Sequence, residues 1–140
     1  MATLTFLDSC VLFAAHRGKP AEREPSLAIM NDPGRSFIAS PFLYLEVMPK
    51  AVYHRNKSEI EFYRTYFDKK VGILMNDVES IVNIAREESE RCGLAAMDAL
   101  HVAAAYLAEA EVLYTLEHKD KPIYRTSLVR VVWVEPQETS

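Results

Sequence analysis

The sequence is short of several residue types, and each shortage excludes a class of protein. Among its 140 residues are four glycines, two cysteines and one tryptophan. So few glycines leave no glycine-rich loop of the kind that wraps nucleotide phosphates. Cys10 and Cys92 form neither a CxxC pair nor a disulfide framework, so we expect two reduced thiols and a cytoplasmic protein.

Long apolar runs and an excess of positive charge are also absent. The apolar runs are too short to span a bilayer, and the N-terminus lacks the basic segment of a signal peptide, so we expect no membrane association. Because the formal net charge is −4, binding to nucleic acid would need a local basic patch or a bound metal. The remaining composition is typical of one globular domain, which we expect over residues 1–135 with a loose tail at 136–140.

Strand and helix signals alternate along the whole chain. Short apolar, β-rich runs predict strands at 3–7, 36–39, 71–74, 112–115 and 129–134. Between them, capping signals and apolar periodicity predict helices at 22–30, at 42–55, from a capping box at 58–61, from Asp77 to Gly93, and at 94–110. This alternation predicts an α/β fold, a three-layer α/β/α domain with a mainly parallel, roughly five-stranded sheet.

The segment 94–110, LAAMDALHVAAAYLAEA, is apolar on nearly every side and is expected to form a buried helix. Asp98 lies near its start, with His101 three positions later on the same face. A carboxylate placed there is costly unless a hydrogen-bond partner or a metal shares its charge. Asp98 is therefore a candidate functional residue, with a backbone-bonded buried acid as the structural alternative.

Three further acidic residues, Asp8, Glu46 and Glu117, each follow a predicted strand or lie early in the next helix. In parallel sheets this edge, at the carboxyl ends of the strands, is where ligands bind. Carboxylates gathered there would repel one another, and a hard divalent cation such as Mg²⁺ or Mn²⁺ would relieve the repulsion through oxygen ligation. Taken singly, Asp8 could instead cap a helix, and Glu46 and Glu117 could be solvated charges.

Together these segments resemble the PIN-domain family, which includes the VapC-like toxin ribonucleases. The matching motifs are LDSCVL around Asp8, LYLEVM around Glu46, MDALHVAAA around Asp98 and YTLE ending in Glu117. The resemblance implies a Mg²⁺- or Mn²⁺-dependent endoribonuclease that cuts single-stranded RNA, with these four residues as catalytic metal ligands. It also implies an antitoxin protein as partner, if the chain is the toxin of a toxin–antitoxin pair, and a homodimer.

The fourth motif departs from the family pattern. Family members often carry an aspartate after the fourth strand, whereas this chain offers Glu117, with Asp120 as a competing candidate. The departure motivates an alternative function, a catalytically weak or inactive PIN-like module that binds RNA or a protein. A third class, an aspartyl-phosphate enzyme, is disfavoured because Asp8-Ser9-Cys10 lacks the second aspartate that such sites need.

Several other residues are candidates for supporting roles. Ser9 and Thr115 are expected to orient a ligand or water by hydrogen bonding. His101 is expected to be a core or supporting histidine bonded to a carboxylate or to backbone. Five basic residues either line a path for RNA or are ordinary solvated charges: Arg17, Lys19, Lys119, Lys121 and Arg125. The only tryptophan, Trp133, is expected to pack rather than to recognise a ligand.

Overall fold

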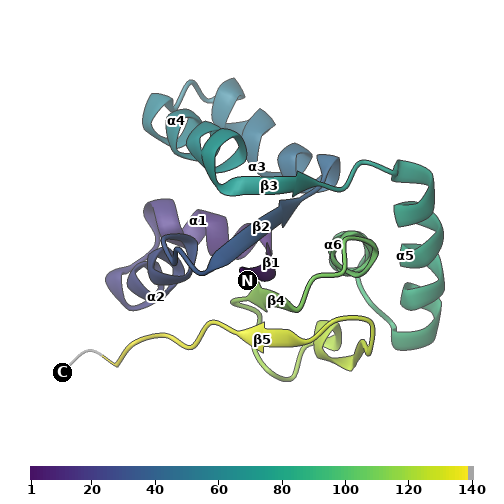
Figure 1. Ribbon diagram of the computed structural model, residues 1–140. Coiled ribbons are helices and arrows are strands. Elements are labelled where there is room, and N and C mark those ends of the chain that lie inside the picture. Colours follow the sequence, from purple (N-terminus) through teal and green to yellow (C-terminus); the bar gives the residue numbers. More distant parts are fainter. Residues whose placement is uncertain (139–140) are drawn as a thin grey trace.

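In the part of the chain that the structure describes, five strands lie parallel in one sheet. The computed structural model describes residues 1–138, and the strands run in the order β3-β2-β1-β4-β5 (Figure 1). Their bounds are β1 Thr3–Leu7, β2 Arg35–Ala39, β3 Val71–Leu74, β4 Val112–Thr115 and β5 Val131–Trp133. Three strands have the predicted bounds, the second begins one residue earlier, and the last is shorter than the predicted 129–134.

Within residues 1–138, six α-helices and two short helices connect the strands. They are α1 Ser9–Arg17, α2 Pro20–Met30, α3 Pro41–Tyr53, α4 Lys57–Thr65, the π-helix η1 Tyr66–Lys70, α5 Val78–Cys92, α6 Ala96–Leu107 and the 3₁₀-helix η2 Pro122–Arg125. Figure 1 shows α1 and α2 on one side of the sheet and α5 and α6 on the other. Because right-handed crossovers reverse faces when the strand order reverses after β3, this arrangement follows from the topology. The predicted three-layer α/β/α class with a parallel sheet is confirmed.

The central strands are covered on both faces. Phe6 and Leu7 in β1, Ile38 in β2 and Leu113 in β4 have no exposed surface, as expected for strands between two layers of helices. On one side the alanines of α6 at 103–105 are also completely buried. Their small side chains let α6 lie close to the sheet, and this closeness fixes the position of the residues near its start.

The starts of α3 and α5 are set by short polar side chains. The Ser40 hydroxyl accepts a hydrogen bond from the Leu43 N–H and caps α3 as predicted, and Asp77 caps α5 through the Ser80 N–H. At the end of α5, Gly93 has the predicted left-handed conformation, with φ of 70°.

Four helix predictions were wrong in detail, and one helix was not predicted. Helix α3 covers Pro41–Tyr53 rather than the predicted 42–55. The capping box belongs to Asn56 rather than Ser58, because the Asn56 side chain accepts from the Glu59 N–H and donates to the Glu59 carboxylate. The buried helix covers only Ala96–Leu107, and α2 begins at Pro20, two residues before the prediction. Helix α1 was not predicted, although Asp8 had been considered as a cap.

No helix within residues 1–138 is long and apolar enough to cross a membrane. The tail predicted at 136–140 lies partly outside the described residues, since 139 and 140 are not described. Within the described part, the backbone N–H of Gln137 donates to the carbonyl oxygen of Ala21 at 2.8 Å. The chain after β5 therefore makes a backbone hydrogen bond to α2.

Candidate metal centre

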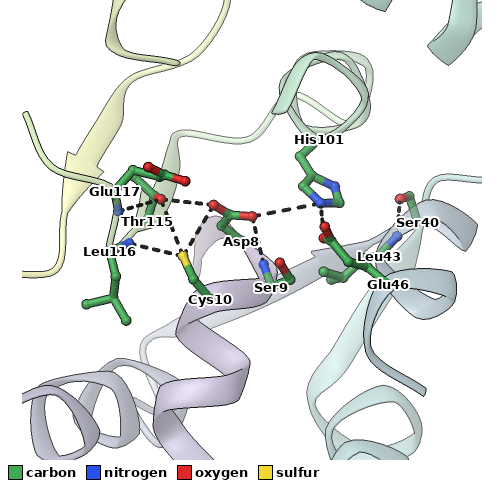
Figure 2. Close-up of polar contacts among 10 residues, drawn as sticks. All are labelled: Asp8, Ser9, Cys10, Ser40, Leu43, Glu46, His101, Thr115, Leu116 and Glu117. Atoms are coloured by element: carbon green, nitrogen blue, oxygen red, sulfur yellow. Dashed lines mark hydrogen bonds and ion pairs between the residues drawn. The ribbon is translucent and has the colours of Figure 1, made fainter. Parts of the chain in front are cut away.

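The predicted acidic residues gather at the carboxyl ends of β1 and β4. Asp8 immediately follows β1 and caps α1, Glu46 lies in the second turn of α3, and Glu117 follows β4. Asp98 lies in the first turn of α6. Figure 2 shows that Asp8 lies between Thr115 on one side and the Glu46–His101 pair on the other. The strand ends and helix starts of four elements thus bring the carboxylates to one edge of the sheet.

Asp8 is the most constrained carboxylate of the site. Its side chain is almost completely buried, with 4% of the residue exposed. One carboxylate oxygen accepts the Ser9 backbone N–H at 2.8 Å, and the other accepts the Thr115 hydroxyl at 2.9 Å. Each carboxylate oxygen has a second lone pair, so these hydrogen bonds fix the group and still leave it able to bind a cation.

Glu46 is held by His101, which is completely buried in α6. His101 Nε2 lies 2.7 Å from Glu46 Oε1 and 3.8 Å from Asp8 Oδ1. An ionised carboxylate only accepts hydrogen bonds, so Nε2 carries the proton and donates it to Glu46. The other nitrogen, Nδ1, is buried without a partner among residues 1–138. Nε2 is therefore the nitrogen through which the ring acts on Glu46.

The hydrogen bond from His101 has an electrostatic effect on Glu46. That hydrogen bond is the largest influence on the Glu46 carboxyl, and with smaller contributions from the His101 charge, Ser9 and Lys50 it outweighs burial and lowers the pKa. Glu46 consequently stays ionised at neutral pH. His101 therefore contacts a carboxylate, one of the two kinds of partner expected for it, and its supporting role stays a prediction.

Asp98 has the opposite perturbation. Burial is the largest cause, followed by repulsion from Asp8 and Glu117, and together they raise the pKa of Asp98 to about 6. The rise shows that the negative charges at this edge of the sheet are close enough to destabilise one another. A divalent cation at the same place would reverse the effect by favouring the ionised form.

One group of side chains has the geometry of a metal site. Ligand atoms of Asp8, Glu46 and His101 all lie within 4.8 Å of one another. The two carboxylates fit a hard cation, whereas His101 Nε2 already donates to Glu46 and is better assigned as a support for that ligand. Asp98 and Glu117 do not belong to this tight group, although their charges act on one another.

The two candidates for the fourth acidic position have different surroundings. Glu117 is half-buried, and its backbone N–H donates to the Thr115 hydroxyl while its carbonyl accepts the Tyr124 hydroxyl. Asp120 is exposed, and its carboxylate accepts a hydrogen bond from His118 at 3.1 Å. Since Glu117 also raises the pKa of Asp98, its charge acts on the site.

A sequence model described as "PIN domain" matches residues 5–127. The chain belongs to the PIN-domain family. The resemblance found in the sequence motifs is thereby confirmed. Comparison with curated proteins gives no match.

Solved structures of other proteins share the fold. VapBC2 from Rickettsia felis, bound to a DNA fragment from its promoter, has 15% identity, a TM-score of 0.68, and coverage of 94% of this chain and 98% of that chain. A toxin–antitoxin complex from Klebsiella pneumoniae has 19% identity, a TM-score of 0.64, and coverage of 89% and 94%. FitAcB from Neisseria gonorrhoeae has 16% identity, a TM-score of 0.61, and coverage of 91% and 95%. At these identities the likeness shows the PIN fold alone.

Two residues of the PIN domain's site were missed by sequence reasoning. Cys10 lies 3.4 Å from Asp8 Oδ2 and accepts the Leu116 N–H, and burial followed by the charge of Asp8 raises its pKa to about 12. Tyr124 donates its hydroxyl to the Glu117 carbonyl at 2.6 Å. Cys10 could have been predicted from the sequence, because it lies two positions after Asp8. Nothing in the sequence predicts the contact of Tyr124 with Glu117.

The five predicted basic residues of the PIN domain are differently placed. Arg17 pairs with Glu59 at 3.7 Å, and Arg125 donates to the Cys92 carbonyl at the end of α5. Lys119 lies over the Trp133 ring, 5.2 Å from its centroid. The remaining two are exposed surface residues: Lys19 and Lys121. Of the five, Lys119 and Lys121 lie on the segment that follows Glu117.

Proposed function

We propose that this PIN domain is a Mg²⁺- or Mn²⁺-dependent endoribonuclease that hydrolyses phosphodiester bonds of single-stranded RNA. The observation that carries the proposal is the close approach of Asp8 and Glu46, whose ligand atoms lie within 4.8 Å of each other and of His101. The raised pKa of Asp98 supports it, because an anionic pocket of this kind is costly without a cation.

Each acidic residue has a distinct role in this proposal. Asp8 and Glu46 are the primary ligands, Asp98 completes the set from α6, and Glu117 is a weaker fourth ligand. A bound divalent cation would neutralise the scissile phosphate and lower the pKa of an attacking water. Without it, the carboxylates would repel the phosphate, which explains why the proposed activity depends on metal.

Neighbouring side chains keep these carboxylates in place. The Thr115 hydroxyl and the Ser9 backbone N–H orient Asp8, and the buried His101 orients Glu46 through Oε1, which leaves Oε2 for other partners. Such hydrogen bonds fix the geometry of a ligand and tune its affinity for metal. The exposed basic residues Lys119 and Lys121 would meet RNA phosphates next to this centre.

We also propose an antitoxin partner and a homodimer for this chain. The antitoxin is suggested by the solved structures that share this fold, two of which are VapBC2 and a toxin–antitoxin complex. The homodimer is suggested by an apolar pocket of about 660 Å³ between α3 and the outermost strand β3, beside the exposed side chains of Tyr44, Leu45 and Leu74. Two free thiols support a reducing, cytoplasmic environment.

The second candidate function, RNA or protein binding without cleavage, is favoured by the glutamate at position 117. Calorimetric titration separates the two functions. Binding of Mn²⁺ is expected for the nuclease, whereas no detectable binding at millimolar concentrations would favour the non-cutting module.

Cleavage of labelled single-stranded RNA tests the proposed nuclease directly. Cutting is expected with Mg²⁺ or Mn²⁺, not with EDTA, and it should be lost in Asp8→Asn and Asp98→Asn. Asp68→Asn is a matched control, because Asp68 is exposed on η1 away from the site. Cutting that persists in EDTA or in the Asp8 variant would show that the activity comes from elsewhere.

A further inference from the structure

The only tryptophan of the chain lies close to the candidate metal centre. Trp133 is on β5, the edge strand opposite β3, and it is the register partner of Thr115 on β4. The Thr115 hydroxyl in turn donates to Asp8. With adjacent strands about 4.8 Å apart, Trp133 lies roughly 10 Å along the sheet from the strand that carries Asp8. That distance suits a group that contacts the same substrate molecule.

An open pocket of about 500 Å³ surrounds this tryptophan. It is lined by aromatic and charged side chains, among them Lys119, Tyr124, Arg130, Trp133 and Glu135. We call this the Trp133 pocket. Its volume is within the range of small-molecule sites, and the indole ring is only half-buried in it. Trp133 thus lines a pocket that is open to solvent, and the sequence expectation that it packs rather than recognises a ligand stays a prediction.

The contacts inside the Trp133 pocket point to an aromatic, anionic ligand. The Lys119 ammonium lies 5.2 Å from the centroid of the indole ring, and the His118 ring lies 5.8 Å away. The ammonium group is attracted to the face of the indole ring. A flat aromatic ligand could take its place by stacking on the same face. Tyr124 joins the pocket to the candidate metal centre, because its hydroxyl is bonded to the Glu117 carbonyl.

We propose that the Trp133 pocket binds one nucleobase of single-stranded RNA beside the scissile phosphate. The base would stack on Trp133. Lys119 would then leave the indole ring and, with Arg130, contact backbone phosphates. The negative charge of Glu135 would repel phosphates from its part of the pocket. Unpaired bases can enter such a pocket, whereas bases within a duplex are already stacked on one another. The inference rests on the proposed function, since it assigns part of the RNA substrate to a particular place.

Fluorescence of the intact protein gives a direct test, because Trp133 is its only tryptophan. With Mg²⁺ present, and recorded by stopped flow before the RNA is cut, a single-stranded RNA oligonucleotide should quench the emission saturably. An abasic oligonucleotide of the same length and charge should bind more weakly and leave the emission nearly unchanged. No quenching by RNA, or equal quenching by the abasic oligonucleotide, would overturn the inference.

Substitutions provide a second, independent readout. Stacking contributes enough that Trp133→Leu should weaken RNA binding about 5- to 150-fold, measured by anisotropy of labelled RNA, and Trp133→Phe should recover part of it. Tyr53→Leu is the matched control, because Tyr53 is an exposed aromatic residue at the end of α3. Equal binding by the leucine and wild-type proteins contradicts the pocket.

The outcomes of these tests separate the pocket from the nuclease. If RNA is cut with unchanged KM in Trp133→Leu and no quenching is seen, the pocket is wrong and the nuclease stands. If RNA quenches Trp133 but is not cut with Mg²⁺ or Mn²⁺, the base-binding pocket stands and the nuclease is wrong.

Discussion

Replacing Asp98 by asparagine should stabilise the metal-free protein while it removes a metal ligand. The folded pKa of about 6 compares with an ordinary value of 3.8, a difference of about 2 units. At 1.36 kcal/mol per unit this corresponds to about 3 kcal/mol of destabilisation at pH 7. Because Asp98 is only half-buried, solvent screening reduces the figure to about 1–2 kcal/mol.

The pH dependence has a definite sign. Since burial and neighbouring carboxylates raise the folded pKa of Asp98 above its unfolded value, the folded protein holds this proton more tightly. The contribution is fully present below about pH 4 and is lost as pH rises through about 6. Wild-type stability in EDTA should therefore contain a fall across this interval that Asp98→Asn lacks.

Thermal unfolding in EDTA at several pH values measures this effect. At pH 7 the melting temperature of Asp98→Asn should exceed that of the wild type by about 3–8 °C, as expected for 1–2 kcal/mol in a domain of this size. Adding Mn²⁺ should then stabilise the wild type and not the variant. Asp120→Asn, with an exposed carboxylate, is the control and should change stability by less than about 0.5 kcal/mol. A destabilised Asp98→Asn, or one with the wild-type pH profile, would refute the reasoning.

Three further predictions concern residues around the same centre and the proposed dimer. His101→Leu removes the donor to Glu46 and should weaken Mn²⁺ binding, measured by calorimetry, about 10- to 100-fold. His101→Gln can still donate and should recover part of the affinity. Equal affinities in the leucine variant and the wild type would contradict the assigned role. Glu117→Gln should lower kcat/KM on RNA about 10- to 100-fold, whereas Asp120→Asn should leave kcat/KM unchanged. Loss of activity in Asp120→Asn but not in Glu117→Gln would assign the fourth ligand to position 120. Leu45→Glu places a charge in the exposed apolar surface of α3, so this variant should sediment as a monomer where the wild type sediments as a dimer. A variant with the mass of the wild-type dimer would locate the interface elsewhere.

The sequence predicted the sheet and the acidic edge because both depend on local signals. Apolar runs between turn residues define parallel strands, and the ends of such strands meet at one edge whatever the details of the helices. Asp8, Glu46 and Asp98 could therefore be grouped without coordinates. The PIN-domain family, recognised from the motifs around these residues, is confirmed by the match over residues 5–127.

Details that depend on competing local signals were less predictable. Asn56 and Ser58 both offer a cap two residues apart, and only the reciprocal contact of Asn56 with Glu59 decides between them. Helix α1 was missed because its sequence, SCVLFAAHR, continues the apolar run of β1 with no turn residue other than Asp8 and Ser9. The start of α1 is evident only in the structure, where the Asp8 carboxylate accepts the Ser9 backbone N–H.

Contacts between distant segments could not be predicted at all. His101 and Glu46 are 55 positions apart, and no periodicity relates α6 to α3. Thr115 reaches Asp8 across 107 positions because β1 and β4 are adjacent in the strand order. The same strand order puts Trp133 next to Thr115, at a pocket of about 500 Å³.

Anomalous scattering from crystals soaked with Mn²⁺ tests the central claim most directly. One or two strong peaks are expected between Asp8, Glu46 and Asp98, with carboxylate oxygens as ligands and His101 bonded to Glu46. Crystals of Asp8→Asn, soaked in the same way, should lose the main peak. The absence of any peak at this edge in wild-type crystals, or peaks ligated only by residues elsewhere, would contradict the assignment of a metal centre.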